Sequence, residues 1–384
     1  MRDRTMQQRI TVVLGVVLVF AMLSSTAIGL LRNLGQRGSS NSHAQAATSV
    51  APPTVPPPIS NLESIDFSET YLHPSGLFTA ALPSGWQVTN ETSTTGEAQV
   101  TMRNSTQLSV VEIRVTRPTS EQDISTIEGV SAIFDDSWLT SSWREYSTWD
   151  ESARTIEDGR VVIDFNLSRS GQTYIGRQES FTDGTWVYSV RAVTPGNASQ
   201  MLQYVLDNEV NRFQMLEQYV GAPLEWNAYF DGTSNYIIRY PSTWAVVDSA
   251  QGAPVSINGA NAQLRVEALE ATVDSEEAAS AYTEGLRGGI NVLSVEPVEQ
   301  FDASGFNVAY TLSTLDGATQ SGLVTILNDD EGSYAANLLL TDISDTDLNT
   351  VDIEAEDTPQ TVSEAIALLG TFSLNPDMNL VAAE

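Results

Sequence analysis

The sequence predicts an α+β protein of two tandem domains built around antiparallel sheets, preceded by one transmembrane helix. The first observation is a repeated motif: FTAALPSGWQV at residues 78–88 and YIIRYPSTWAV at residues 236–246 share an aromatic residue, Pro, Ser and Trp at matching places. The second is that, in each copy, strand patterns form a central run with helical patterns before and after it. This order is typical of an α+β sandwich.

The match between the two copies continues through the rest of the chain. Residues 161–167 correspond to residues 306–312, and Gly184 corresponds to Gly332. Along these matches the spacing falls from 158 to 145 residues and then rises to 148. Because insertions and deletions in loops change spacing but preserve order, we interpret the chain as two diverged copies of about 150 residues, each able to bury a core.

The N-terminal region predicts a membrane anchor. Residues 10–31 carry no charge and, at about 1.5 Å per residue, are long enough to cross the hydrocarbon core of a bilayer. A signal peptide cleaved after Ala27 is the alternative, since Ser25 and Ala27 are small residues at positions −3 and −1. The apolar run continues past that point, so we expect a retained single-pass anchor, with residues 1–9 in the cytoplasm and the later residues outside it.

The region after the anchor predicts a stalk and then the two repeats. Residues 32–60 consist mainly of Ser, Gln, Ala, Asn, Thr and Pro, a composition that cannot bury a core and favours extended geometry. We place the first repeat at residues 61–220 and the second at residues 221–384, because Gly221 and Pro223 punctuate the chain between them.

Composition limits the partners of the chain. The net charge is −31, and all 18 basic residues are Arg. Such an acidic chain is not expected to bind nucleic acid or to lie flat on anionic lipid, whereas cations and a basic protein partner are compatible with it. There is no Cys, so the exported domains must hold by packing alone, which suits a prokaryotic envelope.

Each copy is expected to open with a strand, a Pro turn and a second strand that carries a Trp. Trp86 and Trp244 are therefore predicted to occupy equivalent core positions. Residues 161–167 alternate apolar and polar side chains, and Trp186 to Ala192 continue this pattern, which indicates an antiparallel sheet with one buried face.

Two helices are predicted in each copy. Apolar periodicity predicts the earlier ones over residues 120–138 and 275–290. A later helix is expected to be capped by Asn197 in the first copy and by Thr358 in the second, where Gly370 ends it.

These features together resemble the PsbP-like fold. The resemblance rests on the Pro-Ser-x-Trp hairpin, the mid-domain helix, the Gly-bounded strands and a final helix that runs into Phe372, Ser373 and Leu374. The superfamily includes an extrinsic protein of photosystem II and a Ran-GTPase release factor. The resemblance implies two tandem α-β-α sandwiches that bind partners without catalysis, and it assigns no binding residue.

Catalytic groups are scarce. The only histidines are His43 and His73, and the absence of Cys and Lys excludes thiol nucleophiles and Schiff bases. We therefore expect no enzymatic activity and no cofactor, with a hydrolase that uses paired carboxylates as the alternative.

An aromatic segment of the first repeat is the candidate partner-binding region. It contains Trp143, Tyr146 and Trp149, preceded by Asp135, Asp136 and Trp138. Trp at an interface offers a large apolar area with a polar handle, and it also stacks on sugar rings. The alternative is that these rings enter the core at a junction between helix and strand.

An acidic loop of the second repeat is the weak candidate for a Ca²⁺ site. Asp345, Asp347, Asn349 and Glu356 stand at positions 1, 3, 5 and 12 of a loop that is similar to a calcium-binding loop. Thr350 replaces the glycine needed at the sharp turn, which favours a solvated loop instead.

The sequence therefore predicts a membrane-anchored, extracytoplasmic binding or accessory module with an unidentified protein partner. The alternative is an envelope carbohydrate-binding protein that uses the Trp-rich segment.

Overall fold

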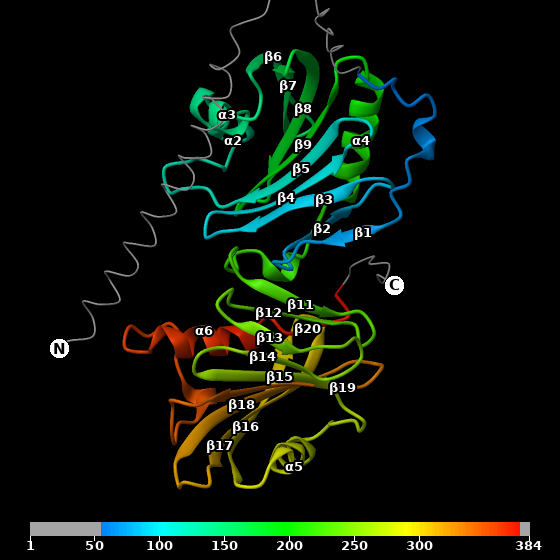
Figure 1. Cartoon of the computed structure of the whole chain (residues 1–384). Coiled ribbons are helices and arrows are strands. Elements are labelled where there is room, and N and C mark those ends of the chain that lie inside the picture. The colour runs from blue at the N-terminus through cyan, green and yellow to red at the C-terminus, as the bar shows by residue number, and fades with distance from the viewer. Residues whose placement is uncertain (1–54, 377–384) are drawn as a thin grey trace, which may run out of the picture. The chain divides into compact units, whose positions relative to one another are not determined.

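The computed structural model of the chain describes residues 55–376, which belong to one compact unit (Figure 1). These residues are mostly β-structure, with two seven-stranded antiparallel sheets, two three-stranded sheets and a few helices. The predicted anchor at residues 10–31 and most of the predicted stalk lie outside them. Among residues 55–376, no helix is long and apolar enough to span a membrane.

The first half of the described chain runs from β1 to η2. Its small sheet has the order β1-β2-β10, and its large sheet has the order β3-β4-β5-β9-β8-β7-β6. The strands are β1 (Thr70–Leu72), β2 (Phe78–Ala81), β3 (Gln87–Ser93), β4 (Glu97–Asn104), β5 (Ser109–Thr116), β6 (Thr148–Glu157), β7 (Arg160–Arg169), β8 (Gln172–Thr182), β9 (Val187–Pro195) and β10 (Gln214–Met215). The helices are η1 (Leu62–Ser64), α2 (Ile127–Ile133), α3 (Asp136–Ser142), α4 (Ser199–Arg212) and η2 (Glu217–Tyr219).

The second half repeats this topology. Its small sheet has the order β11-β12-β20, and its large sheet has the order β13-β14-β15-β19-β18-β17-β16, which is the first order with each strand number raised by ten. The strands are β11 (Asn227–Asp231), β12 (Tyr236–Tyr240), β13 (Ala245–Asp248), β14 (Val255–Asn258), β15 (Ala262–Ala268), β16 (Ile290–Gln300), β17 (Ala303–Ser313), β18 (Thr319–Asn328), β19 (Ser333–Leu340) and β20 (Ser373–Leu374). The helices are α5 (Glu276–Leu286), η3 (Leu348–Thr350) and α6 (Gln360–Leu369).

Helices cover both faces of each large sheet. In the first half, α4 packs on β8 and β9 from one side, while α2 packs on β7 and β8 from the other (Figure 1). In the second half, α6 packs on β19 and α5 packs on β16 and β17. Each half is therefore layered as expected, but the sheets dominate and the helices are short.

One strand is more buried than predicted, because helices cover both faces of the sheet. The pattern from Trp186 to Ala192 predicted a single buried face, yet every residue of β9 is buried. Tyr188, Val190 and Ala192 enter the core beneath α4, whereas Val187 and Val193 enter the core beneath α2 and α3. β9 lies at the centre of the sheet, where both faces are covered.

The predicted helix over residues 120–138 is wrong in its limits. The structure places two short helices there, α2 and α3, separated at Phe134 and Asp135. Thr126 caps α2, and Asp135 caps α3 by accepting a hydrogen bond from the Trp138 N–H at 2.8 Å. A side chain that binds the backbone in this way starts a new helix instead of continuing the old one.

The predicted caps of the later helices are also wrong. α4 begins after Ala198 and α6 after Pro359, without a side-chain cap in either case. The Asn197 amide donates to the Pro56 carbonyl at 3.5 Å, and the Thr358 hydroxyl donates to the Asp352 carbonyl at 2.8 Å. Both side chains bind neighbouring loops instead of their own helix, because tertiary contacts compete with local capping.

The predicted limit between residues 220 and 221 falls in a packed part of the chain. Tyr219 and Leu224 are buried on either side of it, and Ile237 of β12 belongs to the same apolar cluster as the core of the first half. The Tyr219 hydroxyl donates to the Thr371 carbonyl at 2.8 Å. The two halves therefore share side-chain contacts, and independent folding of each repeat remains a prediction.

Candidate functional site

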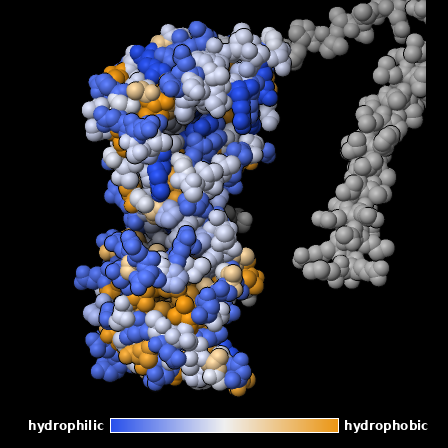
Figure 2. Space-filling model, turned by 90° about the vertical axis from the view of Figure 1, so that its left-hand side faces the viewer, coloured by the Kyte–Doolittle hydropathy of each residue, from blue (hydrophilic) through white to orange (hydrophobic). Residues whose placement is uncertain are grey.

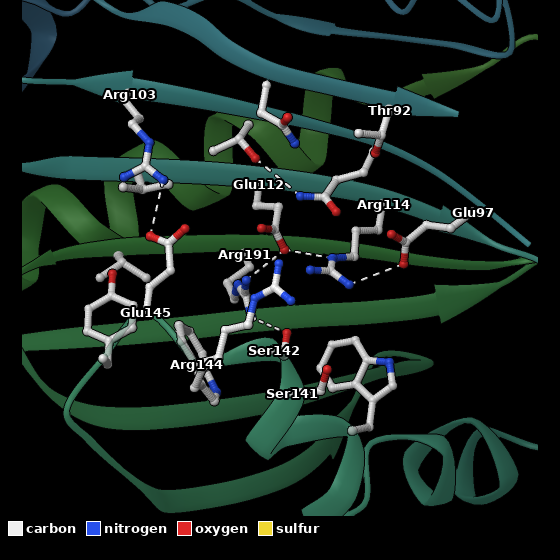
Figure 3. Close-up of a pocket in the computed structure, with 18 residues that line it drawn as sticks. Thr92, Glu97, Arg103, Glu112, Arg114, Ser141, Ser142, Arg144, Glu145 and Arg191 are labelled. Atoms are coloured by element: carbon white, nitrogen blue, oxygen red, sulfur yellow. Dashed lines mark hydrogen bonds and ion pairs between the residues drawn. The ribbon is translucent and has the colours of Figure 1, made fainter. Parts of the chain in front are cut away.

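A polar cleft lies on the large sheet of the first half. Its volume is about 660 Å³, within the range of pockets that enclose small ligands. The floor is formed by β4, β5 and β9, and α3 with the loop after it forms one wall (Figure 3). The polar and charged side chains that line it are Asn90, Thr92, Glu97, Gln99, Thr101, Arg103, Glu112, Arg114, Ser141, Ser142, Arg144, Glu145 and Arg191.

Strand alternation places these charges in the cleft. In β5, Val111, Ile113 and Val115 point into the core, so Glu112 and Arg114 between them point to the opposite face. β4 alternates in the same way. The register of β5 and β9 sets Glu112 directly opposite Arg191. Two strands that are distant in sequence thus bring opposite charges together at the centre of the floor.

Glu112 holds two guanidinium groups on one carboxylate oxygen. Its Oε1 accepts from Arg114 Nε and from Arg191 Nη2, both at 2.7 Å. Arg114 Nη1 also donates to Glu97 Oε2 at 3.1 Å, and Arg191 Nη1 donates to the Ser142 hydroxyl at 2.7 Å. Figure 3 shows this chain of charges across the floor. Such paired charges fix the orientation of the guanidinium groups.

Burial and pairing together determine the protonation of these groups. Burial alone raises the pKa of Glu112, but Arg191 and Arg114 outweigh it and hold this pKa below its ordinary value. Burial lowers the pKa of Arg191, whereas Glu112 and Glu97 overcome the effect of burial and raise the pKa of Arg114. The floor is therefore a charged network of two carboxylates, Glu97 and Glu112, and two guanidinium groups in partly desolvated surroundings.

The mouth of the cleft holds looser charges. Glu145 Oε2 lies 3.4 Å from Arg103 Nη2 and 3.4 Å from Arg169 Nη1, and more than half of the Glu145 side chain is exposed. Arg144 is exposed beside it and makes no hydrogen bond or ion pair with any residue of the described part of the chain. The mouth therefore offers cationic groups that solvent can reach.

The structure brings two of the three predicted partner-binding aromatics to this cleft. Trp143 follows α3 and is almost fully buried, although its ring edge reaches the cleft; Tyr146 is half-buried in the wall. Trp149 lies in β6, packs half-buried against the core beneath α2 and α3, and does not line the cleft. Burial raises the pKa of Tyr146 to about 12, so its hydroxyl stays neutral.

Arginine side chains cover the ring faces that a sugar would need. The Arg191 guanidinium lies 4.0 Å from the centre of the Trp143 ring, and that of Arg114 lies 5.5 Å from the Trp138 ring. Tyr146 meets Trp143 edge to face. These cation–π contacts use the aromatic faces to position cations. The alternative prediction that the segment enters the core holds for Trp143.

The candidate calcium residues do not converge. Asp347 Oδ1 accepts from the Ser294 hydroxyl at 2.8 Å, Asn349 donates to the same hydroxyl at 2.9 Å, and Asp345 accepts from the Thr319 hydroxyl at 3.0 Å. Glu356 is exposed and lies outside these contacts. Within residues 55–376, no group of three or more His, Asp or Glu side chains is placed to hold a metal ion. The solvated-loop interpretation fits these contacts better.

The Trp residues of the repeated motif differ in burial. Trp86 is only 5% exposed, whereas Trp244 is half-buried and packs over Gly259. The prediction of two equivalent core positions is thus correct for Trp86 and wrong for Trp244. A Cβ on Gly259 would lie 2.6 Å from the Trp244 ring, so this glycine allows the ring to rest on the backbone at the edge of the sheet.

Sequence reasoning missed the arginines of the cleft. Arg103, Arg114 and Arg191 looked like ordinary outward residues of three strands, and only strand pairing gathers them. The available signal was that Arg is scarce in an acidic chain, yet β4, β5 and β9 each carry one on a single face.

No protein-family model matches the sequence, and no curated protein matches it. Among solved structures, the chain is similar to cyanobacterial PsbP from Synechocystis sp. PCC 6803, with 12% identity, 38% of this chain and 91% of that chain covered, and a TM-score of 0.28. It is also similar to the immunity protein TplEi from Pseudomonas aeruginosa, with 12% identity, 80% and 97% covered, and a TM-score of 0.23. A complex of Tle4 with Tli4 gives 11% identity, 81% and 99% covered, and a TM-score of 0.23.

These similarities do not assign the chain to a family, because the TM-scores are below 0.3. A PsbP-fold protein is among the structures to which the chain is similar, and the PsbP-like fold of its two halves remains a prediction. The tandem arrangement of two such domains remains a prediction.

Proposed function

We propose that this chain is a non-enzymatic binding protein that captures a protein partner in the cleft of its first half. Residues 10–31 anchor it to the membrane, and its two repeats act outside the cytoplasm. The cleft is the observation that supports this function most directly: a concave surface with a charged floor and accessible cations at its mouth. The floor charges are paired with one another, whereas Arg144 in the same cleft has no ion-pair partner among the described residues; an unpaired cation beside a fixed charged floor favours a binding role over a purely structural one.

A carbohydrate is the second candidate ligand. Trp138 and Tyr146 line the cleft beside hydroxyl and amide side chains, which is the composition of many sugar sites. The covered faces of Trp138 and Trp143 count against it, because stacking on a sugar ring requires a free aromatic face. A neutral oligosaccharide that quenches Trp fluorescence in the wild type would favour this candidate.

Blocking the cleft tests the proposed function. Ser141 is exposed on α3 and lines the cleft, whereas Thr140 is exposed on the same helix and does not line it. The tagged full chain is used to capture partners from solubilised membranes. We expect Ser141→Trp to lose the partner that the wild type captures and Thr140→Trp to retain it. Equal capture by both variants would place the partner elsewhere.

The predicted membrane anchoring and extracytoplasmic location are tested in a separate experiment. In intact cells, externally added protease should degrade the repeats while a cytoplasmic control protein stays whole, and the chain should sediment with membranes. Release of the chain into the medium would instead favour a cleaved signal peptide.

A further inference from the structure

We infer that the cleft binds one carboxylate group of a protein partner and that Glu145 occupies the place of this carboxylate in the unbound protein. This inference rests on the proposed function and adds the chemistry of the ligand. The partner supplies a single glutamate or aspartate side chain, or a C-terminal carboxylate, to the cations at the mouth of the cleft.

The cleft is a cationic site in an acidic protein. Its lining includes four arginines and three glutamates, a net charge of +1, whereas the whole chain carries −31. Arg144 has no partner among the described residues, and Arg103 has only the 3.4 Å contact with Glu145. Figure 3 shows Arg103 on the strand side of the cleft and Arg144 on the side of α3. Unsatisfied guanidinium groups bind carboxylates through two parallel hydrogen bonds.

Glu145 acts as an internal substitute for the ligand. Its one oxygen contacts both Arg103 and Arg169 at long distance, and the side chain is 54% exposed. Exposed ion pairs of this kind contribute little to stability, so an incoming carboxylate can displace Glu145 without a large loss. The displaced side chain then turns into solvent, and Arg103 and Arg169 are free to pair with the ligand, with Arg144 available in the same cleft.

The floor stays fixed while the mouth exchanges partners. Arg191 is held by Glu112, by Ser142 and by the Trp143 ring, and it is nearly inaccessible to solvent. This preorganised floor, in which Glu97 and Glu112 balance the two arginines, spends no conformational freedom on binding, so the uncompensated positive charge lies at the mouth.

The charges favour a carboxylate over a phosphate. Glu97, Glu112 and Glu145 all line the cleft, so a doubly charged phosphate meets three like charges there, and the acidic chain repels it at longer range. The neighbouring amide and hydroxyl groups of Gln99, Thr101 and Asn90 match the backbone of a peptide. A single carboxylate in an otherwise neutral or basic segment fits best.

Calorimetric titration of the full chain tests the inference. The probes are the peptide acetyl-Ser-Gly-Glu-Gly-Ser-amide, the same peptide with Gln in place of Glu, sodium phosphate and maltotriose. We expect the Glu peptide to bind at least tenfold more tightly than the Gln peptide, since hydrogen bonds to charged groups are worth about tenfold or more in affinity. Stronger binding of phosphate or maltotriose than of the Glu peptide would overturn the inference.

Three variants test which residues bind the carboxylate: two are expected to weaken binding of the Glu peptide and one to strengthen it. Arg103→Gln and Arg144→Gln should each weaken the Glu peptide about tenfold, whereas Glu145→Gln should tighten it by removing the internal competitor. The matched control is Arg287→Gln, an exposed arginine that lines the equivalent cleft of the second half. Weaker binding by Glu145→Gln, or equal loss with Arg287→Gln, would contradict the inference.

The two proposals fail in different ways. If Ser141→Trp abolishes partner capture but the Glu and Gln peptides bind equally, the cleft is the binding site and its ligand is not a carboxylate. If the peptide binds as expected but Ser141→Trp still captures the partner, the carboxylate site is correct and the proposed partner surface is wrong.

Discussion

The two halves hold a cleft at the same place in the same topology but line it with different chemistry. The second cleft, about 640 Å³, lies on β14, β15 and β19 beside α5. In the first half Glu112 is opposite Arg191, whereas in the second half Arg265 is opposite Asn337 at the same distance from the preceding hairpin. The two halves thus share a topology, while the buried ion pair belongs to one half alone among the described strands. Fold and site are separable properties.

The second cleft and the surface of the second half are also more apolar than those of the first half. The second cleft is lined by Val247, Leu286, Ile290, Leu312 and Leu339 together with Arg265 and Arg287. Large exposed apolar side chains are also more frequent in the second half, where Val247 and Leu315 are the most exposed. Figure 2 shows such patches among hydrophilic residues on one face. The comparison supports placing the proposed polar binding site in the first half.

The strongest way to break this comparison is to remove the buried ion pair from the first half. Arg191→Leu alone leaves the mostly buried Glu112 with fewer partners, and we expect it to destabilise the protein by about 3–5 kcal/mol. The double variant Glu112→Gln with Arg191→Leu should recover most of this loss, because a neutral pair needs no compensation. Urea unfolding of the two variants measures the difference. A double variant as unstable as the single one would show that the loss does not come from an unpaired Glu112.

The repeated Trp offers a second comparison. Trp86→Ala should cost about 3–5 kcal/mol because the ring is enclosed in the core, and Trp244→Ala should cost clearly less because its ring is half-buried. Thermal melts of both variants test this order. Equal shifts would show that the second ring is as enclosed as the first.

The two later helices, α4 and α6, differ in one buried residue: α4 buries a glutamate and α6 does not. Burial raises the pKa of Glu209 in α4 to about 8 from 4.5, whereas the buried residues of α6 are all apolar. The folded state holds this proton more tightly than the unfolded state, so its contribution to stability is complete below about pH 4.5 and is lost as the pH rises through 8.

We therefore expect Glu209 to reduce the free energy of unfolding by about 2 kcal/mol between pH 5 and pH 7. Glu209→Gln should remove this loss and be more stable than the wild type at pH 8. Urea titrations at three pH values, with the exposed Glu217→Gln as the control, measure it. An unchanged pH dependence in Glu209→Gln would place the charge in water.

The smallest expected effect concerns the mouth of the cleft. Glu145→Gln should change the free energy of unfolding by less than about 1 kcal/mol, because its ion pairs are long and exposed. A thermal melt checks this, and a large loss would mean that Glu145 is structural instead of an exchangeable partner. The result also decides whether binding changes in this variant can be attributed to charge.

The sequence by itself determined the elements whose signals are local. Alternation predicted strands at residues 161–167 and 306–312, and the structure places β7 at Arg160–Arg169 and β17 at Ala303–Ser313. The constant order of matches predicted two copies, which appear as two sheets of the same strand order. Apolar periodicity predicted a helix over residues 275–290; its start is correct, because α5 begins at Glu276 after the N-cap Ser275, but α5 ends at Leu286 and Ile290 begins β16.

The tertiary structure alone decided what depends on strand order and coverage. The central position of β9 buries both of its faces, and its pairing with β5 sets Arg191 against Glu112 across 79 residues of chain. No local pattern encodes which outward side chains of distant strands will meet, because register and sheet order are set by the packing of the whole domain. The aromatic segment was visible in the sequence, but the arginines that cover its rings and form the cleft became visible only once the sheet was assembled.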